Sequence, residues 1–130
     1  MRTLLAVLLF SSASSGAFAK CTTPSVAVTG TVTNGAGEAV PGAVVAVSWI
    51  LGDQPRGPLQ SHTDQQGAFR LEFQFPTFTK STLLRGDVCR ESINLVSVSA
   101  YSPGYRSKPV LAPVTNWSAE AVLVLSPLSE

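Results

Sequence analysis

Few residues in this 130-residue chain have side chains suited to catalysis, and they form no familiar motif. His62 is the single histidine, so no pair of imidazoles can share a proton or hold a metal ion. A lone histidine on an exposed strand is usually only solvated unless a carboxylate or a nucleophile lies beside it. The chain also lacks a Gly-x-Ser-x-Gly sequence and a glycine loop that could cradle a phosphate. We therefore expect no catalytic site, no cofactor and no metal site.

The segment Asp64-Gln65-Gln66-Gly67 resembles the start of a calcium-binding loop only superficially. Calcium needs several oxygen ligands, which such loops supply from carboxylates at alternate positions. This segment has one carboxylate, and Gly67 is the residue type that accepts the positive φ of a tight reversal. The sequence therefore predicts a turn between two strands here.

Four aromatic side chains are candidates for facing a ligand, because a sugar ring can stack on an aromatic face. They are Trp49, Tyr101, Tyr105 and Trp117. Packing in the core or at its corners is the alternative interpretation, since aromatic side chains dominate protein cores. Asn116-Trp117-Ser118 also fits the acceptor sequence for N-glycosylation, which matters only in a eukaryotic secretory route.

The two cysteines, Cys21 and Cys89, are expected to form a structural disulfide. An isolated pair in an oxidising compartment is more often bridged than free. The bridge would close a loop of about 70 residues, for which the chain-entropy model gives roughly 4 kcal/mol of stabilisation. A redox or metal-binding pair is the alternative, but the chain has no Cys-x-x-Cys sequence and only one histidine to add.

The first nineteen residues have the pattern of an export signal. Arg2 supplies a positive start, residues 4–10 form an apolar core, and Ala17-Phe18-Ala19 is a small-x-small cleavage site. The apolar core is much shorter than the roughly 20 residues that span a bilayer. Lipidation of Cys21 is the alternative, but Lys20 stands where a small residue is expected. We predict a signal peptide over 1–19 and one domain over 20–130.

Composition excludes two classes of partner for the mature chain. Without Arg2, eight basic residues balance eight acidic ones, so nothing favours nucleic acid or an anionic membrane. No second apolar segment approaches the length of a membrane span. We expect a soluble mature chain with no nucleic-acid partner and no membrane insertion after signal cleavage.

Alternation of apolar and polar residues predicts an all-β domain of seven short strands. The most regular strand places Phe69, Leu71, Phe73 and Phe75 on one face. Residues 51–59 contain two glycines and two prolines and are predicted to be a loop. Residues 77–91 are irregular, and either an edge strand or a short helix remains open there. The seven predicted strands cover residues 26–33, 42–50, 60–63, 68–75, 93–101, 105–110 and 119–125.

The last of these strands is apolar on both faces. Ala121, Leu123 and Leu125 alternate with Val122 and Val124. A strand of this kind is expected to be central in its sheet and covered on both sides. Seven short strands separated by turns favour a β-sandwich.

Short segments along the chain form an ordered pattern over Val26 to Val110. They are Gly30-Thr31-Val32, a glycine turn, Val40-Pro41-Gly42-Ala43-Val44-Val45-Ala46-Val47, Thr63-Asp64-x-x-Gly67-x-Phe69-x-Leu71, and Val98-Ser99-Ala100 before Gly104-Tyr105. This pattern resembles the carboxypeptidase regulatory-like domain. The resemblance implies a seven-stranded antiparallel transthyretin-like (Ig-like) β-sandwich. It also implies a module for binding, spacing or folding support, because the family has no common catalytic set. The segment 77–91 and the cysteine pair depart from the family pattern.

Enzymes with similar sandwiches provide an alternative that the sequence matches poorly. The transthyretin-like hydrolase of hydroxyisourate uses histidines and a C-terminal Tyr-Arg-Gly-Ser. Here Tyr105-Arg106-Ser107 repeats that sequence only in part, before another predicted strand, and a second histidine is missing. Iron dioxygenases of similar fold use two tyrosines with two histidines, so the same shortage argues against their site.

The sequence therefore predicts an exported, non-catalytic β-sandwich module in the periplasm or outside the cell. It would act by protein–protein contacts with an unidentified protein of the cell envelope. A carbohydrate-binding module with a glycan ligand is the alternative, and it would use the four aromatics named above. A transthyretin-like hydrolase is the third hypothesis.

Overall fold

The computed structural model describes residues 21–81 and 86–128, and all regular elements in them are β-strands. The predicted signal peptide, residues 1–19, lies outside the described residues. The strands are β1 (Ser25–Thr33), β2 (Val44–Leu51), β3 (Gln54–His62), β4 (Ala68–Gln74), β5 (Thr79–Ser81), β6 (Gly86–Val88), β7 (Leu95–Ser102), β8 (Tyr105–Arg106), β9 (Val110–Pro113), β10 (Ser118–Val124) and β11 (Ser126–Pro127).

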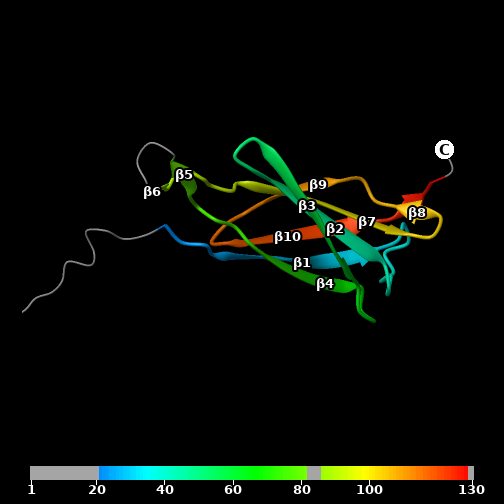
Figure 1. Ribbon diagram of the computed structural model, residues 1–130. Coiled ribbons are helices and arrows are strands. Elements are labelled where there is room, and N and C mark those ends of the chain that lie inside the picture. The colour runs from blue at the N-terminus through cyan, green and yellow to red at the C-terminus, as the bar shows by residue number, and fades with distance from the viewer. Residues whose placement is uncertain (1–20, 82–85, 129–130) are drawn as a thin grey trace, which may run out of the picture.

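Two sheets pack face to face, which confirms the predicted all-β sandwich (Figure 1). The three-stranded sheet has the order β10-β1-β4. The six-stranded sheet has the order β11-β8-β7-β2-β3, with β9 paired to β7. A separate hairpin, β5-β6, lies in the segment 77–91 that the sequence left open.

The core forms where the alternating apolar residues of both sheets meet. Phe69, Leu71, Phe73 and Phe75 are all buried, as their spacing predicted. Trp49 of β2 stacks on Phe73 of β4 with ring centroids 3.7 Å apart, so this aromatic pair joins the two sheets. The other strands contribute Val26, Val28 and Val32, Val45 and Val47, Val96, Val98 and Ala100, and Ala119, Ala121 and Leu123.

The prediction of a loop over 51–59 is wrong. β2 runs to Leu51, and β3 returns beside it over Gln54–His62. Pro55 and Pro58 are compatible with this strand because β3 lies at the edge of its sheet, where a missing N–H breaks no ladder. The ladder is irregular between Val47 and Trp49. An edge strand thus accepts residues that normally indicate a loop.

The predicted strand count and strand positions also need correction. The described residues contain eleven strands instead of seven, although β8 and β11 are two residues long. The predicted strand over 105–110 is divided into β8 and β9, which pair with different parts of β7. β8 forms a tight hairpin with β7 and also pairs with β11, whereas β9 pairs with the start of β7. The pairings of β8 with β11 and of β9 with β7 join residues farther apart in sequence, which a local pattern does not report.

The expectation of a wholly antiparallel sandwich is wrong at one pairing. β10 lies parallel to β1, in register from Ala27 opposite Ser118 to Thr33 opposite Val124. β10 is also an edge strand, with Val122 68% and Val124 48% exposed, so it is not central and covered as predicted. The alternate residues Ala121, Leu123 and Leu125 face the core.

The predicted disulfide between Cys21 and Cys89 is present, with the two Cα atoms 5.6 Å apart. Beside it, the backbone N–H and the hydroxyl of Thr77 both donate to the carbonyl of Thr22, at 3.0 and 2.6 Å. The bridge therefore holds the residues before β1 against the two ends of the segment 77–91. Disulfides are typical of proteins outside the cytoplasm.

Breaking this disulfide should lower the free energy of unfolding by about 4 kcal/mol, because it closes a long loop in the unfolded chain. The measurement compares urea unfolding of the protein with that of the Cys21→Ala, Cys89→Ala double variant. Two alkylatable thiols in the native protein, or equal unfolding midpoints, would contradict the assignment.

Replacing Gly30 should also destabilise the fold. A Cβ at this position would lie 1.8 Å from the carbonyl oxygen of Ala121 on β10 and 2.9 Å from the ring of Phe69. Because β1 and β10 would have to move apart, we expect Gly30→Ala to cost about 3 kcal/mol or more. Gly35→Ala is the matched control, since no atom lies within 4 Å of the added methyl group. Similar melting temperatures for the two variants would show that the close approach is unimportant.

Candidate functional site

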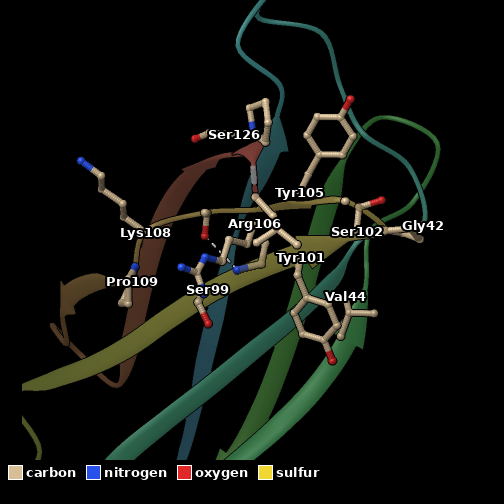
Figure 2. A pocket seen from close by; sticks show the side chains of 16 residues that line it. Gly42, Val44, Ser99, Tyr101, Ser102, Tyr105, Arg106, Lys108, Pro109 and Ser126 are labelled. Atoms are coloured by element: carbon tan, nitrogen blue, oxygen red, sulfur yellow. Dashed lines mark hydrogen bonds between the residues drawn. The ribbon is translucent and has the colours of Figure 1, made fainter. Parts of the chain in front are cut away.

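The structure does not bring the four candidate aromatics together. Trp49 packs at the edge of the core against Phe73. Trp117 precedes β10, whereas Tyr101 and Tyr105 lie near β11, beyond the other end of that strand. A seven-residue strand is about 23 Å long, so a single platform of all four is excluded. Tyr101 and Tyr105 share the β7-β8 hairpin, but Figure 2 shows their rings pointing to opposite sides.

An open cavity of about 1200 Å³ surrounds the β7-β8 hairpin (Figure 2). Among the described residues that line it, none is acidic and two are cationic. They come from the start of β2, from β7 and β8, from the segment after β8, and from the end of the described chain. The lining residues are Gly42, Val44, residues 99–109 and Ser126, Pro127 and Leu128.

One row of side chains crosses this cavity on the outer face of the six-stranded sheet. Ser126 on β11 is in register with Arg106 on β8, and Arg106 is in register with Tyr101 on β7. Tyr101 is opposite Val44 on β2, which is opposite His62 on β3. Partners directly opposite one another share a face of the sheet. We call these five residues the Tyr101 row.

Hydrogen bonds fix the centre of the row from two sides. The buried hydroxyl of Ser107 accepts a bond from the N–H of Ala100 at 2.9 Å, and the N–H of Ser107 donates to the carbonyl of Ala100 at 2.8 Å. These bonds keep the chain after β8 against β7. On the other side, Nε2 of Gln60 donates to the hydroxyl of Tyr101 at 3.1 Å. This bond fixes the position of the phenol hydroxyl.

Asp64, the acidic side chain that the sequence analysis considered, has a structural role. Oδ1 of Asp64 accepts bonds from the N–H groups of Gln66 and Ala68 at 2.8 and 2.9 Å, and Gly67 has a φ of 76°. The predicted turn is confirmed. Within residues 21–81 and 86–128, no cluster of three or more His, Cys, Asp or Glu side chains is placed to hold a metal ion.

One carboxylate on the opposite sheet has a shifted pKa. The pKa of Glu72 is lowered because Arg70 donates a hydrogen bond to it, and further by the charge of that guanidinium and by a bond from the hydroxyl of Ser25. Both partners are exposed on the outer face of β4. The pair therefore makes the surface of β4 polar and takes no part in the cavity.

The free edge of β10 is a surface that the sequence analysis missed. The N–H of Leu125 donates to Thr33 at 2.8 Å, and the carbonyl of Trp117 accepts from Ala27 at 3.0 Å. Odd-numbered residues of this strand therefore direct their backbone groups toward β1. The backbone N–H and C=O groups of Glu120, Val122 and Val124 therefore point to the free edge. The alternation of this strand was visible in the sequence, but exposure of its second face was not.

Trp117 occupies an unusual backbone conformation between β9 and β10. Asn116 and Trp117 have positive φ angles of 52° and 62°. Thr115 and Ser118 exchange both backbone hydrogen bonds, at 2.8 and 3.0 Å, around these two residues. This is the geometry of a two-residue primed turn, whose second position normally holds glycine. Trp117 is 40% exposed in this turn.

No helix in the described part of the chain has the length and apolarity needed to cross a membrane. No protein-family model and no curated protein matches the sequence. Membership of the carboxypeptidase regulatory-like family therefore stays a prediction.

Several solved structures are similar in shape. The 3-chlorocatechol 1,2-dioxygenase of Rhodococcus opacus is 10% identical, with a TM-score of 0.47, over 83% of this chain and 62% of that chain. The chlorocatechol 1,2-dioxygenase of Pseudomonas putida is 17% identical, with a TM-score of 0.45, over 79% and 59%. The shaft pilin SpaA of Lactobacillus rhamnosus GG is 10% identical, with a TM-score of 0.45, over 82% and 52%. This chain thus spans between half and two thirds of each. Similarity of this degree supports no inference about activity, ligand or partner.

The strain at Trp117 leads to a stability prediction. A side chain with a Cβ costs about 1–2 kcal/mol in the left-handed conformation, whereas glycine has no such penalty. Trp117→Gly should therefore be more stable than Trp117→Ala by about 1 kcal/mol, measured by thermal melting. Val124 occupies an ordinary strand position and serves as the control. There Val124→Ala should be more stable than Val124→Gly, because glycine loses more backbone entropy on folding. The same order at both positions would contradict the assigned strain.

Proposed function

We propose that this protein is an exported, non-catalytic module that binds a protein partner. The partner would contribute a strand that pairs with the free edge of β10. The observation behind the proposal is that this edge lacks the features that normally prevent strand pairing. Proteins protect their sheet edges with prolines, charges, bulges or very short strands.

The other sheet edges are protected in this way. β3 contains Pro55, Arg56 and Pro58. β9 ends at Pro113, and Pro109 stands immediately before its first residue. β11 is two residues long, and β4 exposes Arg70 and Glu72. Prolines in particular remove the donors that a pairing strand would need. These edges are poor templates for strand addition.

The edge of β10 has no proline and a single charged residue, Glu120. The N–H and C=O groups of Glu120, Val122 and Val124 point outward, and a partner strand can bond to all of them. Val122 and Val124 add apolar surface at the same place. Burying one valine side chain contributes about 1.5–3 kcal/mol relative to exposure. Backbone bonds would supply affinity, and the valines would select an apolar partner strand.

Export and location form part of the proposal. The signal-like pattern over residues 1–19 and the disulfide between Cys21 and Cys89 support a periplasmic or secreted protein. The partner we propose is a protein of the cell envelope. The resemblance to carboxypeptidase regulatory-like domains supports a module without catalytic activity.

The arrangement around Tyr105-Arg106-Ser107 gives the hydrolase alternative little support. Ser107 is buried and bonded to Ala100, so its hydroxyl is engaged in holding β7. His62 lies three strands away from Arg106 across the sheet. Loss of a hydrolytic activity in His62→Ala, with the fold intact, would restore the enzyme hypothesis.

Cross-linking in the native envelope tests the proposed edge. A photo-reactive amino acid at position 124, on the same face and edge of β10 as Val122, should capture one recurrent protein, because the partner strand lies beside it. The same group at Gln74, an exposed position on β4, is the control and should not capture that protein.

A second variant tests whether pairing uses the backbone. The N–H of Val122 faces the free edge, so Val122→Pro removes a donor from the partner and none from β1. We expect capture from the probe at position 124 to fall at least about tenfold in this variant, equivalent to 1.4 kcal/mol, with a nearly unchanged melting temperature. Capture that persists in this variant, or that is equally efficient from position 74, would overturn strand addition at β10.

A further inference from the structure

The Tyr101 row lies on the six-stranded sheet, whereas the β10 edge belongs to the three-stranded sheet. Neither Arg106 nor the nearby Lys108 forms an ion pair within the described residues, and none of the described residues that line their cavity is acidic. A guanidinium with no carboxylate partner in that part of the chain favours an anionic ligand. Arginine binds carboxylates in a bidentate geometry that lysine does not offer.

Tyr101 is the neighbour of Arg106 on the same face of the sheet, and Figure 2 shows the two side chains extending in different directions from there. Residues opposite each other in an antiparallel pair have Cβ atoms about 5 Å apart, and Tyr101 and Arg106 are such a pair. Tyr101 is 43% exposed, and its hydroxyl accepts a hydrogen bond from Gln60. A ligand that reaches both side chains has an acidic group at one point and a flat apolar face at another. A chain of sugar rings that carry carboxylates has both.

Polar side chains lie around the pair on the same face of the sheet. Ser99 and Ser126 offer hydroxyls on the same face, and Gln60 and His62 lie on the neighbouring edge strand. A separate and more apolar depression of this sheet is lined by Ile50, Leu95 and Leu111. A saccharide has hydroxyl groups around an apolar ring face, so it can use both the aromatic ring of Tyr101 and the polar groups around it.

The length of the row favours a polymer. The five residues of the Tyr101 row lie on five adjacent strands, from Ser126 on β11 to His62 on β3. Neighbouring strands are about 4.8 Å apart, so the row extends over about 19 Å. We propose that the Tyr101 row binds an acidic polysaccharide whose chain crosses the strands. Arg106 binds a carboxylate, and the ring of Tyr101 packs against a sugar face.

Affinity electrophoresis of the folded, disulfide-bonded protein tests this site, with polygalacturonate as the acidic probe and dextran as the neutral one. Polygalacturonate should retard the protein and dextran should not. Arg106→Gln should weaken the retardation at least about tenfold, and Tyr101→Leu should do so to a similar extent. Arg56→Gln is the matched control, because it removes the same charge from an exposed position on β3. It should change the affinity less than about twofold.

Three outcomes would overturn the proposal. They are equal retardation by dextran, equal losses in Arg106→Gln and Arg56→Gln, and no retardation by polygalacturonate. The first would remove the acidic ligand class, and the second would indicate unspecific attraction to any positive charge. Val122→Pro should leave polysaccharide binding unchanged, so this site and the β10 edge can fail independently.

Discussion

The parallel pairing of β1 with β10 determines how the rest of the sandwich is assembled. The two backbones approach so closely at Gly30 that a single methyl group would overlap the carbonyl of Ala121. This contact joins residues near the two ends of the described chain, and it aligns the buried valines of β1 with Ala121 and Leu123. Because loop closure over so many residues is entropically costly, the disulfide near the start of β1 supports the same association by restricting the unfolded chain.

Both candidate surfaces follow from that pairing. β10 can bond to β1 on one side only, so the backbone groups of Glu120, Val122 and Val124 are left at a free edge. At the end of β10 the chain crosses to the other sheet, where Ser126 pairs with Arg106. A strand that completes one sheet thus also brings the last member of the Tyr101 row into place.

The most accurate sequence inferences were those that depend on neighbours along the chain. The faces of β1 and β4 and the turn at Asp64 follow from alternation and from the short reach of one carboxylate. The prediction failed at β3 and β10. Prolines in β3 indicate a loop unless the strand is known to be an edge, and the valines of β10 indicate a covered strand unless its neighbours are known. Whether an edge is open depends on strand order, which local patterns do not report.

The sequence by itself determined the all-β class, the core faces of the strands and the pairing of Cys21 with Cys89, since only two cysteines exist. These properties depend on residue type and on a period of two. The tertiary structure alone decided that Tyr101 lies beside Arg106, that Trp49 packs against Phe73, and that β10 is an edge. The physical reason is that contacts across a sheet or between sheets join residues far apart in the chain, and strand order and register choose which of them meet.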